Sequence, residues 1–249
     1  MSGHSKWSSI KHKKGAADAK RGALFTKLAR AIQVAAKEGG GDAAGNAALG
    51  NAVQKAKDAR MPKDNIERAI AKGTGADSDA AAFESVLYEG YGPGGVAVLV
   101  EALTDNRNRT GSDVRHAFSR NGGNLGEPGS VAWLFEKKGL VLVDAERYSE
   151  DDLMVAIDAG AEDVLADESV LEVVTAPADL ATVREALEQA GVALQSAELT
   201  MRPSTRVEVE EKQVGGLLRL LEGLEEHDDI VAVNANFDVD PAVLERVAA

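Results

Sequence analysis

The sequence predicts an α+β protein with a helical N-terminal domain and two α/β (ferredoxin-like) domains, one inserted in the other. Three observations predict this class. Apolar residues at helical spacing fill residues 1–73. A complete strand–helix–strand–strand–helix–strand series fills residues 135–203. The flanking segments, 74–134 and 204–249, each hold only part of an α/β sandwich, so together they are expected to form one domain that the series interrupts.

Three helices are expected in the N-terminal domain. The first covers residues 23–37 and ends at a run of three glycines, and its apolar residues share one face: Phe25, Leu28, Ala29, Ile32 and Ala36. A second helix is expected over residues 43–60, where Met61-Pro62 stops it. A third is expected over residues 64–72, because Asp64 and Glu67 have the spacing of a capping box.

Two strand-like runs follow, at residues 83–89 and 96–103, joined by the segment GYGPGG. Gly90, Gly92 and Gly95 match the dinucleotide-binding pattern G-x-G-x-x-G. That site requires a helix after the glycines, whereas a valine-rich strand follows here. The segment is therefore interpreted as a hairpin turn.

The remaining helices and strands are predicted from the same kinds of apolar pattern and turn residues. A polar loop leads into a short helix that ends at Gly122-Gly123. The inserted series has strands at 139–144, 162–167, 170–176 and 192–200, with helices at 150–159 and 178–190. The last expected elements are a strand at 206–210, a helix at 212–226 and a strand at 230–239.

The charge of the chain is divided by region. Residues 1–72 hold 15 basic and 6 acidic residues, a net +9, whereas residues 144–249 hold 7 and 26, a net −19. The first 37 residues contain a single acid, Asp18. Exposed helix faces are commonly charged, but that explanation predicts mixed signs. A basic N-terminal domain on an acidic protein favours nucleic acid as the partner.

The candidate contact residues lie in a polar basic arm and on one side of the first helix. Lysines in the arm suit phosphates, and Trp7 either stacks on a base or packs into the bundle. On a helical wheel the basic residues lie opposite the packing face and form a cationic stripe. The candidates are Lys6, Trp7, Lys11, His12, Lys13, Lys14, Lys20, Arg21, Lys27, Arg30 and Lys37.

A second basic cluster is expected near residue 110. Its proposed contact residues are Arg107, Arg109 and Arg115. Arginine suits bidentate phosphate binding. Pairing with the nearby Asp105 and Asp113 is an equal alternative.

Composition and motifs argue against several classes. The chain has no cysteine, so disulfides and thiolate metal sites are excluded and a cytoplasmic location is expected. No apolar run reaches the ~18 residues of a membrane span. Phosphate-loop, zinc-protease and serine-hydrolase motifs are absent, so no catalytic residue, cofactor, metal or small-molecule substrate is expected. His227 beside Asp228 and Asp229 is interpreted as a helix end with exposed acids rather than a metal site.

Several long motifs occur in a recognisable order: GHSKWSSIKHKKGAADAKRGALFTKL, MPKDNIERAI, YEGYGPGGVAVLVEALTDNRNRT and GGNLGEPGSVAWLF. Together they resemble the YebC/PmpR family of bacterial proteins. The resemblance implies three domains in a discontinuous arrangement and a non-enzymatic cytoplasmic role. One departure concerns residues 46–53, NAALGNAV, where relatives usually carry Pro and Arg, so the second helix is less basic here.

The resemblance implies a regulator of gene expression. Family members are described as probable DNA-binding transcriptional regulators, and mitochondrial and some bacterial relatives as translation activators acting at the ribosome. The first expectation is therefore transcriptional control through duplex DNA, and its rival is a ribosome-associated factor that binds ribosomal RNA through the same domain. Gln33 is the one obvious base reader of the first helix, so sequence selectivity is weakly supported. A protein-interaction scaffold would leave the basic start unexplained.

Overall fold

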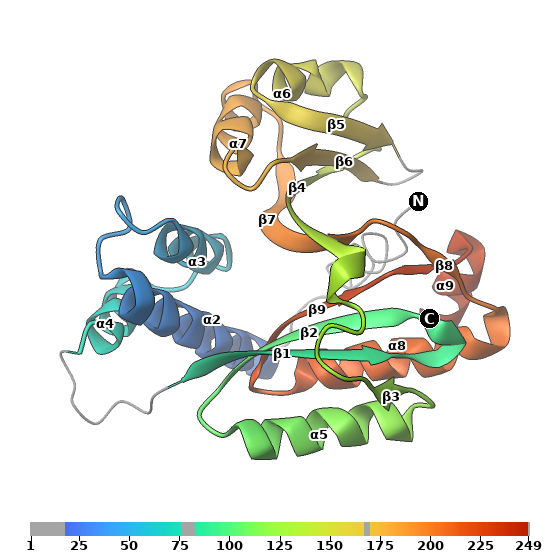
Figure 1. The fold of residues 1–249 in the computed structure, drawn as a ribbon. Coiled ribbons are helices and arrows are strands. Elements are labelled where there is room, and N and C mark those ends of the chain that lie inside the picture. Colours follow the sequence, from blue (N-terminus) through green and yellow to red (C-terminus); the bar gives the residue numbers. More distant parts are fainter. Residues whose placement is uncertain (1–17, 76–82, 167–169, 249) are drawn as a thin grey trace.

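The computed structural model describes residues 18–75, 83–166 and 170–248. Three units are visible: a bundle of helices and two four-stranded sheets, each with helices packed on it (Figure 1). We call them the helical bundle, the first sheet and the second sheet. The α+β class predicted from the sequence is confirmed.

The helical bundle consists of α2 (Asp18–Gly39), α3 (Ala47–Asp58) and α4 (Lys63–Gly73). Its core contains Leu28, Ile32, Leu49, Met61 and Ile66, each at most 6% exposed. The helices therefore pack through the apolar face that the periodicity predicts.

Asn46 explains why α3 starts at residue 47 rather than 43. Its side-chain oxygen accepts a hydrogen bond from the N–H of Leu49 at 3.1 Å, which caps the helix. Its Nδ2 donates to the carbonyls of Ala35 at 2.7 Å and Gly40 at 2.9 Å. One side chain thus begins α3 and ties that beginning to the end of α2.

The predicted capping box at the third helix is wrong. α4 starts at Lys63, one residue before Asp64, and its N-cap is Pro62, which makes no side-chain capping bond. Asp64 lies inside the first turn, where its charge still complements the helix dipole.

The first sheet has the strand order β3-β1-β2-β9, and its pairs are antiparallel. The strands are β1 (Glu84–Tyr91), β2 (Ala97–Thr104), β3 (Asn124–Leu125) and β9 (Ile230–Ala235). Helices α5 (Arg107–Arg120) and α8 (Glu211–Glu226) cover one face, where Val98 and Val100 meet Phe118 and Leu217 in a continuous core (Figure 1).

The glycine-rich segment between β1 and β2 is a hairpin connection, as predicted. Gly90 pairs with Val98 across the two antiparallel strands, and a short 3-10 turn, Pro93–Gly95, joins them. Gly94 and Gly95 have φ of 79° and 74°, which glycine adopts at no steric cost. The pattern of glycines therefore serves the turn.

The second sheet has the strand order β5-β6-β4-β7, also antiparallel. The strands are β4 (Phe135–Asp144), β5 (Ala161–Ala166), β6 (Val170–Thr175) and β7 (Leu194–Pro203), and the helices are α6 (Met154–Asp158) and α7 (Leu180–Gln189). This succession is the predicted β-α-β-β-α-β unit. The helix expected at 150–159 is split into a 3-10 turn, Asp151–Leu153, and α6.

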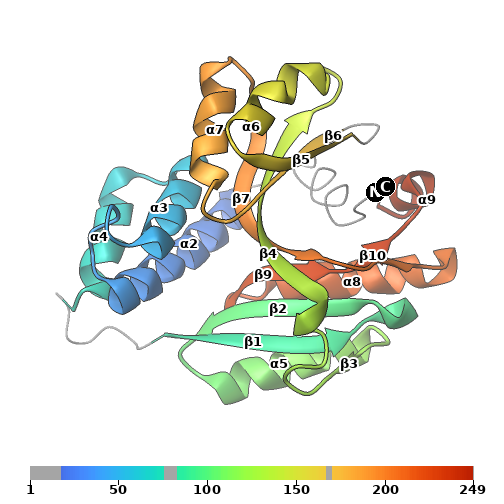
Figure 2. The ribbon, with the colours of Figure 1, turned by 45° about the horizontal axis from the view of Figure 1, so that its top comes forward.

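Strands β4 and β7 form a ribbon that reaches both sheets (Figure 2). They pair from Phe135 opposite Pro203 to Val143 opposite Leu194. At one end Phe135 packs on Leu99 of the first sheet, and at the other Val143 lies in the core of the second. The domain boundaries at residues 73, 134 and 203 stay a prediction.

The last part of the chain departs most from the expected elements. The strand expected over 230–239 is interrupted at Asn236, whose side-chain oxygen accepts the N–H of Ala97 at 2.7 Å. Beyond it β10 (Phe237–Asp238) pairs in parallel with β8 (Val207–Glu208), and α9 (Pro241–Ala248) follows. The first sheet also differs in chain order from β-α-β-β-α-β, because β1 and β2 are joined directly by the hairpin.

A buried carboxylate fixes the loop between β3 and β4, which includes the 3-10 turn Ala132–Leu134. Glu89 is 5% exposed and accepts hydrogen bonds from the backbone N–H groups of Gly129 at 2.6 Å, Val131 at 2.7 Å and Ala132 at 2.7 Å. Burial by itself raises the pKa of Glu89, but these three bonds outweigh burial and leave the pKa below its ordinary value of 4.5.

We expect Glu89→Gln to lower the free energy of unfolding by about 1–3 kcal/mol at neutral pH, because an amide cannot accept all three bonds. The wild-type contribution is complete above the ordinary pKa of 4.5 and is lost as the pH falls through the lowered folded pKa. Urea midpoints of both proteins should therefore converge in strong acid. A difference in urea midpoint between the two proteins that stays constant with pH would contradict this prediction. Glu127→Gln, at an exposed glutamate of the same loop, is the control.

Among the helices in the described ranges, none is long and apolar enough to cross a membrane.

Candidate nucleic-acid interface

The predicted contact residues fall into three groups. Six of them lie outside the described residues: Lys6, Trp7, Lys11, His12, Lys13 and Lys14. Lys20 belongs to α2, and Arg21 and Lys37 are exposed on that helix. The third group, Lys27 and Arg30, contacts the first sheet.

Lys27 and Arg30 hold α2 against the turn between α8 and β9. The ammonium of Lys27 donates to the carbonyl of Glu225 at 2.5 Å. The guanidinium of Arg30 donates to the carbonyl of Asp228 at 2.9 Å and to the carboxylate of Asp229 at 2.8 Å. This corrects the expectation that the whole cationic stripe is free for a partner, because its middle is an interface between two units of the chain.

Asp229 is the centre of this interface. Its side chain is 5% exposed, and its second oxygen, Oδ2, accepts hydrogen bonds from Thr110 at 2.7 Å and from Arg109 at 3.0 Å. Its backbone carbonyl accepts the N–H of Leu103 at 2.7 Å. One carboxylate thus joins Arg30 of the bundle to Arg109 of α5. The interpretation of this helix end as exposed acids is wrong for Asp229.

The charged form of Asp229 is favoured despite its burial. Burial alone raises the pKa of this carboxyl. The hydrogen bonds from Thr110 and Arg109 and the nearby charges of Arg109 and Arg30 outweigh burial, so the net pKa lies below its usual value. Asp229 is therefore an anion at neutral pH, neutralised by two arginines.

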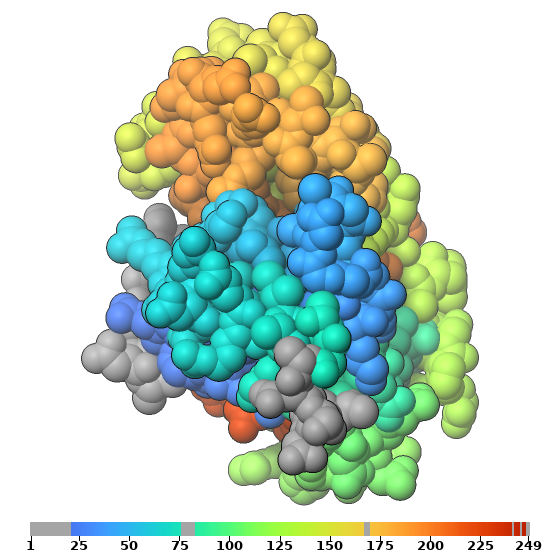
Figure 3. Space-filling model, turned by 90° about the vertical axis from the view of Figure 1, so that its left-hand side faces the viewer, coloured from blue at the N-terminus to red at the C-terminus, as the bar shows by residue number. Residues whose placement is uncertain are grey.

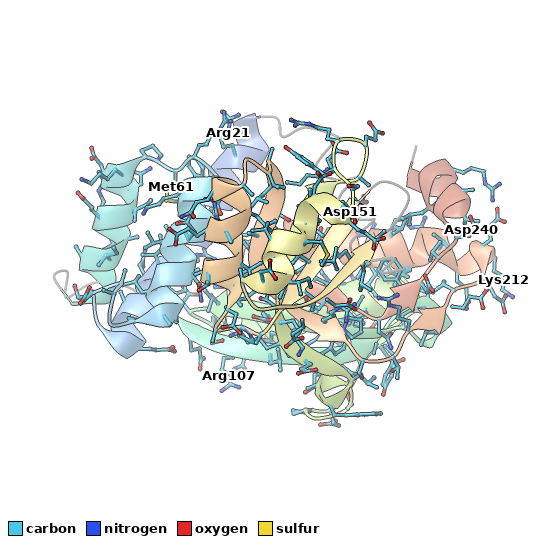
Figure 4. The ribbon with its side chains drawn as sticks, turned by 90° about the horizontal axis from the view of Figure 1, so that it is seen from above. Arg21, Met61, Arg107, Asp151, Lys212 and Asp240 are labelled. Carbon is cyan, nitrogen blue, oxygen red and sulfur yellow. The ribbon has the colours of Figure 1, made fainter. Side chains whose placement is uncertain are left out.

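The second predicted cluster is partly used inside the protein. Arg109 pairs with Asp105 at 2.7 Å as well as with Asp229, which agrees with the intramolecular alternative. Arg107 lies 3.7 Å from Glu84, and Arg115 is exposed. Arg21 and Arg107 lie on opposite sides of the molecule (Figure 4), so the start of α2 and the second cluster do not form one continuous surface.

The bundle also contacts the second sheet. Asp58 of α3 accepts two hydrogen bonds from the guanidinium of Arg184 on α7, at 2.7 and 2.8 Å, and Lys55 pairs with Glu198 of β7 at 2.6 Å. Burial raises the pKa of Asp58, but the bonds from Arg184 outweigh it and the net pKa is lowered. Figure 3 shows the α7 and β7 part of the second sheet, in orange, directly above the bundle.

Exposed cations remain on the bundle outside these contacts. They are Lys37, Lys57, Arg60, Lys63, Arg68 and Lys72. The ion pair of Lys63 with Glu67 at 3.4 Å is on the surface and worth little. The helical wheel of α2 predicts only the cationic stripe of that helix and gives no signal for the cations of α3 and α4.

The described part of the chain shows no arrangement suited to metal chemistry. Within it, no group of three or more His, Asp and Glu side chains is placed to hold a metal ion. A groove of about 580 Å³ runs between α5 and α8, and its lining includes His116, Arg120, Arg219, Glu222 and His227. The Nδ1 of His227 accepts the N–H of Asp229 at 3.0 Å and its Nε2 faces Asp113 at 3.2 Å, so this histidine belongs to the turn that carries Asp229.

Two family models match nearly the whole chain. One, described as the TACO1/YebC protein N-terminal domain, matches residues 5–76, and the other, described as the TACO1/YebC second and third domain, matches residues 83–237. The chain belongs to the TACO1/YebC family. The resemblance stated from the sequence motifs is thereby confirmed.

Two relatives match this chain along their full length. A probable transcriptional regulatory protein of Rubrobacter xylanophilus is 58% identical over 249 residues, with 100% of both chains covered. One of Desulfotalea psychrophila is 57% identical over 250 residues, again with 100% of both covered. The crystal structure of a conserved hypothetical protein from Aquifex aeolicus matches with a TM-score of 0.80 and 48% identity, covering 90% of this chain and 92% of that one.

Proposed function

We propose that the protein is a transcriptional regulator that binds duplex DNA through the helical bundle and the basic arm before it. The single observation that carries the proposal is charge polarity: residues 1–72 have a net charge of +9 and residues 144–249 have −19. Phosphate neutralisation supplies most of the free energy of non-specific DNA binding, and a basic face on an acidic protein directs it to one side. The names of the relatives from Rubrobacter and Desulfotalea support the transcriptional role.

The proposed contact residues lie in the arm and on α2: Lys6, Trp7, Lys11, His12, Lys13, Lys14, Lys20, Arg21 and Lys37. Lys27 and Arg30 are left out because they bind the α8–β9 turn. Arg107 and Arg115 remain a secondary contact on another side of the molecule. We propose that the protein is not an enzyme and needs no cofactor or metal. We also propose that it is located in the cytoplasm.

Binding of this kind is dominated by the DNA backbone. Lysine and arginine side chains reach phosphates, which position a protein without reading sequence. Gln33, the predicted base reader, is half-buried in the bundle. We therefore propose that affinity depends strongly on salt and that sequence preference is modest.

A competition experiment tests the proposal. Labelled protein is bound to mixed genomic duplex fragments at physiological salt and challenged with purified ribosomes. We expect the protein to stay bound to DNA during the challenge, with a modest enrichment of particular fragments. Release of the protein from all DNA by stoichiometric ribosomes would overturn the proposal in favour of an RNA-directed role for the same basic surface.

A further inference from the structure

Arg60 has a backbone conformation that does not suit its side chain. It lies just after α3, with φ of 59°, in the left-handed region that disfavours residues with a Cβ. Within the described parts of the chain, the other eight residues with positive φ are all glycines: Gly40, Gly75, Gly94, Gly95, Gly122, Gly129, Gly160 and Gly191. Arginine therefore stands where this chain otherwise uses glycine.

The hydrogen bonds around Arg60 show why the conformation is required. The N–H of Arg60 donates to the carbonyl of Lys57 at 2.8 Å, and the N–H of Met61 donates to that of Ala56 at 2.9 Å. These two bonds form the Schellman motif, which ends a helix with a left-handed residue, usually glycine. Met61 is 6% exposed in the bundle core, so the motif is also fixed by packing.

The side chain of Arg60 has no role inside the described part of the protein. It is exposed, and within the described residues it makes no hydrogen bond, ion pair or ring contact. Its surroundings are nevertheless rigid, because Asp58 is held by Arg184 and Pro62 follows Met61. The guanidinium is therefore presented to solvent from a fixed backbone.

The position of Arg60 in the bundle places it near the proposed contact surface. α3 begins beside the end of α2, where Asn46 binds Ala35 and Gly40. Twelve residues of helix then run back by about 18 Å at the usual rise per residue. Because α3 packs on α2, Arg60, just past the end of α3, lies toward the first half of α2, and Met61 belongs to the same bundle core as Leu28.

We infer that Arg60 is a DNA-contact residue whose guanidinium binds phosphodiester oxygens of the duplex. The inference rests on the proposed function and extends its surface from α2 to the end of α3. Backbone strain at an exposed residue, such as Arg60, that makes no side-chain contact with the described part of the chain is typical of a functional constraint. The planar guanidinium matches two phosphate oxygens at once, and the rigid motif orients it before DNA arrives.

The experiment measures the affinity of the full-length protein for a short, labelled duplex of mixed sequence as a function of salt. Arg60→Gln removes the charge and keeps the strain, whereas Arg60→Gly removes both. We expect both variants to reduce the slope of log affinity against log salt by about 0.9, which is the value for one phosphate contact. We also expect Arg60→Gly to melt at the same temperature as the wild type or above it, because glycine suits the conformation.

Arg219→Gln is the matched control, since it removes one exposed cation from α8 on another unit. It should leave the slope unchanged. A wild-type slope in Arg60→Gln, or a lower melting temperature in Arg60→Gly, would overturn the inference and leave the proposed function standing. If the wild-type protein itself shows no salt-dependent affinity for the duplex, the proposed function and the inference both fail.

Discussion

Replacing Asp229 by Asn is expected to lower the free energy of unfolding by about 2–3 kcal/mol. Removing one partner of a buried ion pair costs more than the pair contributes, because the remaining charges lose their counter-ion. Asp229 is 5% exposed and Arg30 is 20% exposed, but Arg109 is 49% exposed, so water screens part of the loss. The urea midpoint measures the change, and the exposed neighbour Asp228→Asn is the control.

The same variant should loosen the bundle from the first sheet before the sheet itself unfolds. Amide hydrogen exchange in α2 is expected to rise more than exchange in β2, which is buried almost throughout. Because the pKa of Asp229 is lowered in the folded protein, the wild-type interaction is complete above the ordinary pKa of 3.8 and weakens as the pH falls through the folded value. Equal exchange in α2 of both proteins at neutral pH would show that Asp229 does not hold the two units together.

The second large effect is expected from the basic arm. Changing Lys11, Lys13, Lys14 and Lys20 together to Ala should reduce the slope of log affinity against log salt by about 3.6, if each lysine neutralises one phosphate of duplex DNA. The helix content in circular dichroism should stay that of the wild type. Filter binding or fluorescence anisotropy at several salt concentrations measures the slope.

The control for the arm variant changes four cations outside the arm and the bundle to Ala: Lys137, Lys212, Arg219 and Arg246. This variant has the same change in net charge, so it separates a local contact from the general field of the protein. If both variants lose the same affinity, the arm is not the contact surface and only net charge matters.

The sequence predicted the fold well where local chemistry decides it. The apolar period of α2, the glycines of the β1–β2 hairpin and the alternation of strands and helices in the second sheet each depend on neighbouring residues, and the structure agrees with them. The start of α3 was missed although Asn46 is a preferred capping residue that binds Leu49 locally, and the further bonds of Asn46 to Ala35 and Gly40 are contacts across the bundle. Long-range contacts of this kind leave no periodic pattern.

The candidate site was predicted less well for the same reason. Lys27 and Arg30 look like free cations on a helical wheel, and Asp229 looks like one of many surface acids. Arg30 and Asp229 are 199 positions apart in the chain. Sequence-spacing patterns describe only neighbouring residues, so they do not predict this pair. Arg60 also has an ordinary sequence context, and only its backbone angle distinguishes it.

The place of the second sheet in the chain sets an order of events during synthesis. β2 and β9 are neighbours in the first sheet, yet all four strands of the second sheet lie between them in sequence. The bundle and the second sheet can complete their own hydrogen bonds while β9 is still unmade, because chains fold unit by unit as they emerge. Asp229 arrives just before β9, so Arg30 gains its carboxylate only as the first sheet closes. The contact of Arg30 with the first sheet is thus made late, and a chain that ends before Asp229 can hold its bundle only through the second sheet, by the pairs of Asp58 with Arg184 and Lys55 with Glu198.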